Sequence, residues 1–161
     1  VLLGDDIIHS EVPTIKQLMN IYEKYNASVI AVEKVDKKDI SGYGVIEPKK
    51  LDERVYQIMD MVEKPSPQDA PSDLAIIGRY ILTPEIFTAL EKTVPDKSGE
   101  IQLTYGLRHL LKQQVVYAYQ FEGKRYDAGN KLGFLKATVE FALRRPDLGD
   151  KFREYLKGLK L

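Results

Sequence analysis

Strand-like and helix-like apolar segments alternate along the chain, and this alternation limits the fold to the α/β class. Short β-branched and aromatic runs are typical of buried strands, whereas apolar residues that recur every three or four positions are typical of amphipathic helices. We predict strands over residues 28–35, 43–47, 55–62, 75–82 and 115–121, and helices that begin near residues 14, 84, 103, 132 and 148. The alternation predicts a largely parallel or mixed sheet with helices on both faces.

Two of these helices carry N-cap signals. Thr14 stands three positions before Gln17, which is the spacing of a capping box. Thr83 precedes a proline and an acid, an order typical of an N-cap, an N1 residue and a first-turn carboxylate. We therefore expect the hydroxyl groups of both threonines to cap helices.

Residues 28 to 82 depart from the alternation, because they hold several strand signals and little helix. We expect this segment to form an antiparallel flap beside the main sheet. The Pro- and Asp-rich stretch over residues 65–73 resembles a linker, and we interpret it as an internal loop. The chain of 161 residues is long enough to bury roughly two-thirds of its unfolded surface, so we predict one domain over residues 1–161.

Composition excludes several kinds of partner and site. The 24 lysine and arginine residues balance the 24 aspartate and glutamate residues, so no overall field favours nucleic acid or an anionic membrane, and we expect neither as a partner. There is no cysteine, which excludes disulfides and thiolate chemistry and suits a cytoplasmic protein. The apolar runs are far shorter than the ~20 residues that a membrane span requires.

The chain opens on an apolar run that stops at two acids, Asp5 and Asp6. A buried strand that ends in carboxylates is a common way to place a metal ligand at the edge of an α/β sheet. Asp5 is therefore a candidate metal ligand, although acids at strand ends also cap turns and helices. Because the first residue is not methionine and falls in a predicted strand, we expect the natural protein to contain residues before Val1.

Carboxylates, lysines and glycines are the remaining groups able to do chemistry, and magnesium-dependent phosphate chemistry uses these groups. His9 and His109 show no spacing for a metal site or a catalytic triad, and we interpret both as structural or exposed. Glu63 and Lys64 follow a predicted strand, where they either bind a ligand or form a surface ion pair. The turn from Asp127 to Lys131 opens a helix whose N-terminus suits an anion, or simply caps that helix.

Six segments taken in order resemble the bacterial UTP-glucose-1-phosphate uridylyltransferases, also called UDP-glucose pyrophosphorylases. These segments are VLLGDD at 1–6, YGV at 43–45, VEKP at 62–65, DLAIIGRY at 73–80, GEIQLT at 99–104 and GKRYDAGNKLG at 123–133. The resemblance covers nearly the whole chain and corresponds to roughly the C-terminal half of that enzyme. The glycine-rich nucleotide loop of the family is absent, and Tyr105 stands where the family pattern has aspartate.

The resemblance implies a Rossmann-like nucleotidyltransferase fold of the glycosyltransferase-A type, incomplete because the N-terminal nucleotide-binding part is missing. It also implies conversion of UTP and glucose 1-phosphate to UDP-glucose and pyrophosphate with Mg²⁺. Asp5 is similar to the metal-binding and catalytic aspartate of the family, and Asp127 to a second metal ligand. The remaining substrate-binding positions by resemblance are Glu63 for sugar hydroxyls, Lys64 for the sugar phosphate and catalysis, Gly44 and Gly78 beside the sugar, and Lys131 near the phosphates.

Three other readings compete with this one. Asp60 falls near the distance at which a response-regulator receiver domain would place its phosphoacceptor, although it lies inside a predicted strand. A related sugar-1-phosphate thymidylyltransferase would differ in the nucleotide-reading segment. A non-catalytic fragment would retain only sugar-phosphate binding or subunit contacts. We expect the 161-residue chain alone to be inactive and to form a homo-oligomer through an open sheet edge and its closing helices.

Overall fold

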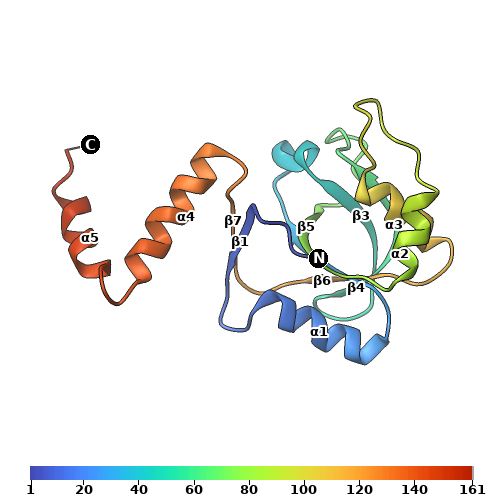
Figure 1. Ribbon diagram of the computed structural model, residues 1–161, viewed down its shortest axis with the longest axis horizontal. Helices are drawn as coiled ribbons and strands as arrows, with labels where there is room; N and C mark the ends of the chain where they lie inside the picture. The colour runs from blue at the N-terminus through green and yellow to red at the C-terminus, as the bar shows by residue number, and fades with distance from the viewer. Residues whose placement is uncertain (161) are drawn as a thin grey trace. The chain divides into compact units, whose positions relative to one another are not determined.

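The computed structural model describes residues 1–160, which divide into two compact units (Figure 1). Unit 1 comprises residues 1–3 and 10–123, and unit 2 comprises residues 4–9 and the chain from Lys124 onward. The single domain over residues 1–161 stays a prediction, and its last residue, Leu161, lies outside the described part of the chain.

Unit 1 is built on a closed barrel whose strands follow the order β2-β5-β3-β4-β6. The strands are β2 (Val29–Lys34), β3 (Gly44–Lys50), β4 (Val55–Glu63), β5 (Leu74–Ile81) and β6 (Tyr117–Gln120). Strand β6 runs parallel to β2 and antiparallel to β4, and the other pairs are antiparallel, so the predicted mixed sheet is confirmed. The expected antiparallel pairing within residues 28–82 is also found. These strands form the barrel itself, however, and not a flap beside another sheet.

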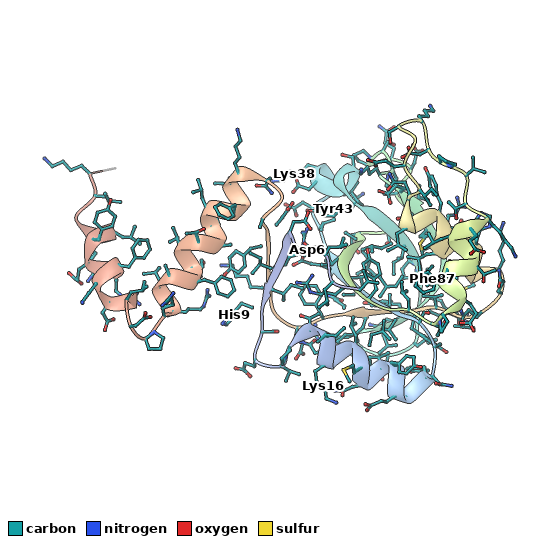
Figure 2. The ribbon with its side chains drawn as sticks, viewed as in Figure 1. Asp6, His9, Lys16, Lys38, Tyr43 and Phe87 are labelled. Carbon is teal, nitrogen blue, oxygen red and sulfur yellow. The ribbon has the colours of Figure 1, made fainter. Side chains whose placement is uncertain are left out.

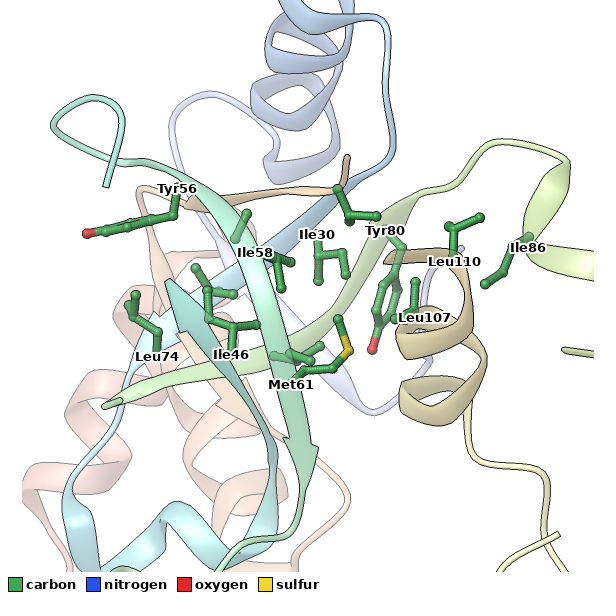
Figure 3. Close-up of a cluster of buried hydrophobic side chains, with 14 of the residues drawn as sticks. Ile30, Ile46, Tyr56, Ile58, Met61, Leu74, Tyr80, Ile86, Leu107 and Leu110 are labelled. Carbon is green, nitrogen blue, oxygen red and sulfur yellow. The ribbon is translucent and has the colours of Figure 1, made fainter. Parts of the chain in front are cut away.

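Helices cover the barrel because strands such as β2 and β5 are apolar at consecutive positions, so both of their faces are buried. Helices α2 (Glu85–Glu91) and α3 (Leu103–Leu111) contribute Ile86, Leu107 and Leu110 to a buried cluster with Ile30 and other barrel side chains (Figure 3). Helix α1 (Thr14–Tyr25) packs against β2 and β5, and its Leu18 is fully buried outside that cluster. A short 3-10 helix, η1 (Lys37–Gly42), precedes β3.

Both expected N-caps are wrong. Thr14 is the first residue of α1, and its buried hydroxyl has no hydrogen-bond partner within the described residues. Gln17 instead ties the start of the helix to a later loop: its amide donates to the carbonyl oxygens of Val12 at 2.8 Å and Glu122 at 2.9 Å. Helix α2 begins at Glu85 without a side-chain cap, and the Thr83 hydroxyl accepts a 2.8 Å hydrogen bond from Gln114.

Unit 2 consists of a two-stranded antiparallel sheet and two helices. Strand β1 (Asp6–His9) pairs with β7 (Lys124–Asp127), and helices α4 (Lys131–Arg144) and α5 (Gly149–Lys157) follow. The predicted strand at the start of the chain is misplaced, since β1 begins at the second acid and does not end before it. The side chains of Val1, Leu2 and Leu3 are exposed, and only the backbone of this segment bonds to β5. Within the described residues, no helix has the length and apolar character needed to cross a bilayer.

Candidate functional site

Two predicted metal ligands meet in unit 2. A Cβ atom added at Gly129 would lie 3.0 Å from Asp5 Oδ2 and 3.1 Å from Asp127 Oδ1. The turn is held by the backbone, because Ala128 N donates to Asp5 O at 2.7 Å and Gly129 N donates to Asp127 Oδ1 at 3.0 Å. A glycine is needed here, since any side chain would fill the space that the two carboxylates face. The two acids therefore converge on one small, open space.

The adjacent acid, Asp6, has a different role. It lies on β1 (Figure 2), where it is buried, and Arg125 Nε of β7 donates a hydrogen bond to its Oδ1. A buried carboxylate needs such a partner, because an unpaired charge in the interior is costly. Asp6 is thus part of the structure of unit 2, whereas Asp5 is exposed and free to bind a ligand.

Helix α4 begins at Lys131, shortly after Asp127. Asn130 is its N-cap and accepts a 2.7 Å hydrogen bond from Gly133 N. Lys131, a predicted substrate-binding residue, is exposed in the first turn. A cavity of about 370 Å³ lies here, lined by Ala128, Gly129, Asn130, Lys131, Phe134 and Leu135. The helix N-terminus and the lysine ammonium group together favour an anion in this cavity.

A second group of predicted site residues meets in unit 1, where β3 begins and β4 ends. Gly44 and Glu63 are paired directly across the two strands. Glu63 Oε2 accepts a 2.5 Å hydrogen bond from Thr104 Oγ1 of α3, and Lys64 Nζ lies 3.9 Å from Glu63 Oε1. A Cβ atom at Gly44 would lie 3.1 Å from Glu63 Oε2, so the absence of a side chain there makes room for the carboxylate.

Lys64 lies in the left-handed backbone region, with φ of 47°. Its amide donates to Tyr43 O at 2.9 Å, which extends the antiparallel pairing of β3 and β4 by one residue. A non-glycine residue at positive φ is uncommon, and such residues gather at functional sites. The side chain of Lys64 is 59% exposed beside a Glu63 side chain that is 15% exposed. The turn thus presents a cation next to a partly buried carboxylate.

Gly78 lies on β5 in unit 1, and it is buried. Its carbonyl oxygen accepts hydrogen bonds from Leu3 N at 2.8 Å and from Arg79 Nη1 at 2.9 Å. The predicted site residues therefore divide into Gly44, Glu63, Lys64 and Gly78 in unit 1 and Asp5, Asp127 and Lys131 in unit 2.

Asp60 forms an ion pair with Arg108 and has a structural role. It lies within β4, and its two carboxylate oxygens accept hydrogen bonds of 2.8 Å each from Arg108 of α3. The bidentate hydrogen bond from Arg108 holds the pKa of Asp60 below its ordinary value. The geometry does not suit a phosphoacceptor, and the receiver-domain reading is wrong.

The histidines agree with their structural interpretation. His9 is exposed at the end of β1 (Figure 2), and its ring makes a T-shaped contact with the ring of Phe141 at a centroid distance of 6.0 Å. Within the described residues, no three His, Asp or Glu side chains form a cluster able to hold a metal. A site with two carboxylates nevertheless fits Mg²⁺, which proteins commonly hold with one or two carboxylates while water and substrate phosphates complete the shell. Asp5 and Asp127 supply that donor set.

Sequence reasoning missed Thr104 as a partner of Glu63. The residue was visible as the last member of the GEIQLT segment, yet nothing in the sequence indicates that its hydroxyl reaches across from α3 to β4. It also missed the Asp6–Arg125 ion pair, because the pairing of β1 with β7 joins segments more than a hundred residues apart.

Three known proteins are similar to this chain over 90% or more of its length. The UTP–glucose-1-phosphate uridylyltransferase of Staphylococcus epidermidis is 48% identical over 161 residues, which are 100% of this chain and 56% of that protein. A crystal structure of UDP-glucose pyrophosphorylase complexed with UDP-glucose is 48% identical, with a TM-score of 0.86 over 90% of this chain and 56% of that one. The UTP-bound UGPase from Acinetobacter baumannii is 32% identical, with a TM-score of 0.88 over 99% of this chain and 56% of that one.

The chain thus spans about half the length of the relatives that it matches, and the family resemblance predicted from its motifs is confirmed. Its assignment to the C-terminal half of the enzyme stays a prediction. A model of the family described as nucleotidyl transferase matches residues 1–143, which is most of the chain. The chain therefore belongs to the nucleotidyl transferase family.

Proposed function

We propose that this chain provides the metal and sugar-phosphate parts of an enzyme that converts UTP and glucose 1-phosphate to UDP-glucose and pyrophosphate. The observation that carries the proposal is the convergence of Asp5 Oδ2 and Asp127 Oδ1 on the space beside Gly129. The names of relatives that are 48% identical point to uridylyl transfer. A structure named as a putative glucose-1-phosphate thymidylyltransferase is also similar, but it is only 23% identical and therefore supports the shared fold alone, so the thymidylyltransferase alternative is not better supported.

The reaction needs no protein base. The second pKa of a phosphate monoester lies near ~6, so glucose 1-phosphate is mostly a dianion at neutral pH and is already a nucleophile. One of its phosphate oxygens attacks the α-phosphorus of UTP, a new phosphorus–oxygen bond forms, and the bond to the β-phosphate breaks to release pyrophosphate. The protein must bring two anions together and hold them in line.

Asp5 and Asp127 would hold Mg²⁺, which supplies positive charge that neutralises the triphosphate and the departing pyrophosphate. In this proposal Lys131, at the N-terminus of α4, adds a further positive charge for phosphate oxygens. The role suits its position, because helix N-termini and ammonium groups both attract anions.

Glu63 and Lys64 would bind the other substrate. An ionised carboxylate accepts hydrogen bonds from sugar hydroxyls, and the exposed ammonium group of Lys64 pairs with the sugar phosphate. Gly44 and Gly78, which have no side chains, allow the sugar to approach the backbone. Lys64 also counts as catalytic in this scheme, because it neutralises the attacking phosphate group.

Three further properties belong to the proposal. The chain alone turns over little or no UTP, because it spans only about half the length of the relatives. It self-associates, since Ala137 is the only buried residue of α4, while Leu132, Phe134 and Leu135 are exposed. The lack of cysteine suits a cytoplasmic location.

Calorimetric titration of the chain with glucose 1-phosphate and with Mg²⁺ tests the two half-sites separately. Lys64→Ala is expected to weaken glucose 1-phosphate binding about tenfold or more, because it removes a charge-assisted contact. Lys38→Ala is the matched control, since Lys38 is an exposed lysine on η1 in the same unit (Figure 2). Asp5→Asn is expected to weaken Mg²⁺ binding, and Asp150→Asn, an exposed acid in unit 2, is its control.

Pyrophosphate release and light scattering complete the test. Turnover by the chain at ~1 per second or faster would contradict the argument that half of the site is missing. A monomer at high concentration would contradict self-association. If Lys38→Ala reduced the affinity for glucose 1-phosphate as much as Lys64→Ala, the sugar phosphate would bind elsewhere.

A further inference from the structure

The hydroxyl group of Thr104 has an unusual partner for a helical threonine. In helices, threonine hydroxyls commonly donate to the carbonyl oxygen four positions earlier. Thr138 of α4 does so, with Oγ1 2.9 Å from Phe134 O, and Thr93, which follows α2, donates to Ala89 O at the same distance. Thr104 is the second residue of α3 and instead donates to Glu63 Oε2 at 2.5 Å.

Because of this contact, the two oxygens of the Glu63 carboxylate have different partners. Oε2 is enclosed, because Thr104 donates to it and the backbone of Gly44 lies beside it. Oε1 is the oxygen that faces Lys64 Nζ, at 3.9 Å. A carboxylate held at one oxygen loses its rotational freedom, so the direction of the second oxygen is fixed as well.

The start of α3 is itself held in place, so Thr104 is a rigid donor. Asp96 Oδ1 accepts hydrogen bonds from Ser98 N at 2.8 Å and Glu100 N at 3.1 Å, and Asp96 Oδ2 accepts one from Gln102 Nε2 at 2.8 Å. Gln102 directly precedes the helix. These bonds fold the loop that delivers Thr104, and the residue is 8% exposed.

We propose that Thr104 is a positioning residue for the sugar half of the site, which aims Glu63 Oε1 at a hydroxyl group of the sugar phosphate. The inference rests on the proposed function and deepens it. Thr104 does not touch the sugar; it acts through Glu63 alone. A side chain without a hydroxyl at position 104 leaves the carboxylate in place but free to rotate, which costs affinity for the sugar and not for phosphate.

Calorimetric titration of the chain with glucose 1-phosphate and with inorganic phosphate distinguishes this role from general support of the fold. Thr104→Val keeps the volume and removes the donor, and it is expected to weaken glucose 1-phosphate binding about tenfold while phosphate binding changes less than about twofold. Thr104→Ser keeps a donor and is expected to bind nearly as the parent does. Thr93→Val is the matched control, because it removes another buried threonine hydroxyl of unit 1 that does not contact Glu63.

A double-variant cycle measures the coupling between Thr104 and Glu63, which a general role of Thr104 in the fold would not produce. If Thr104 acts only through Glu63, Thr104→Val in a Glu63→Gln background adds no further loss of affinity. An equal loss of phosphate affinity, an equal effect of Thr93→Val, or full additivity of the two changes would each overturn the inference. If the parent chain bound phosphate but not glucose 1-phosphate, the proposed function of the sugar half would fail, and the inference with it. Unchanged glucose 1-phosphate affinity in Thr104→Val would overturn the inference alone.

Discussion

Gly133 lies so close to Asp127 that a Cβ atom at position 133 would be 1.8 Å from the Asp127 carbonyl oxygen. The first turn of α4 therefore packs directly on the backbone of one of the proposed metal ligands. No flexible side chain is available to move aside, since the atom in the way belongs to the main chain. The position of helix α4 and the position of Asp127 are thus linked through one glycine.

Gly133→Ala is expected to shift the start of α4 and to displace Asp127. Overpacking of this kind costs ~1 to 3 kcal/mol, and we expect weaker Mg²⁺ binding together with a lower melting temperature. Gly158→Ala is the control, because a Cβ atom there makes its nearest contact at an ordinary 3.4 Å. Circular dichroism melts and Mg²⁺ titrations measure both effects. Unchanged Mg²⁺ affinity in Gly133→Ala would show that the position of α4 does not affect metal binding by Asp5 and Asp127.

Lys64→Gly is expected to raise stability and lower glucose 1-phosphate affinity in the same variant. Glycine adopts the positive φ of position 64 without the steric cost that other residues bear there, which is ~1 kcal/mol. The substitution also removes the ammonium group, so binding falls as in Lys64→Ala. Denaturant unfolding and calorimetric titration measure the two quantities. If Lys64→Gly lowered stability below that of Lys64→Ala, the backbone strain assigned to this turn would be wrong.

Stability should depend on pH through Asp60. The hydrogen bond from Arg108 lowers the pKa of Asp60 in the folded protein below its ordinary value of 3.8. A lowered folded pKa adds stability that is present above 3.8 and is lost as the pH falls toward the folded pKa. The contribution is modest, because both side chains are more than a third exposed. Arg108→Met is therefore expected to be less stable than the parent at pH 7, and this difference should shrink below pH ~4. A difference that stayed constant with pH in urea unfolding would contradict the assignment.

Local patterns in the sequence were sufficient for most of unit 1. The strands over residues 55–62 and 75–82 and the helix over 103–111 were predicted from apolar periodicity, and the structure places β4, β5 and α3 there. Periodicity reports burial along one segment and says nothing of which segments pair. For that reason the closure of the barrel by β6 and the pairing of β1 with β7 were not predicted.

The site residues, too, were predicted from motifs in the sequence, whereas their long-range partners were not. Asp5, Asp127, Glu63 and Lys64 were recognised because the order of the motifs resembles a known family, and the structure brings the acids together as one pair and the other two together in a turn. The N-cap predictions for Thr14 and Thr83 were wrong because the structure starts each helix without a side-chain cap, and nearby side chains make long-range hydrogen bonds instead. Gln17 bonds to Glu122, and Thr83 accepts from Gln114.

Arg125→Met is expected to be the most damaging of these substitutions to the fold, because it removes the arginine that pairs with the buried Asp6 carboxylate. The loss of one member of a buried ion pair costs ~3 to 5 kcal/mol, whereas an exposed pair contributes ~0 to 1 kcal/mol. Arg145→Met is the control, since it breaks an exposed pair with Asp147 in the same unit. Because β1 and β7 carry Asp5 and Asp127 as well, Arg125→Met should also weaken Mg²⁺ binding. Adding Asp6→Leu removes the buried carboxylate and should restore part of the stability. If Arg125→Met melted at the same temperature as Arg145→Met, the buried pair would not be what holds these two strands together.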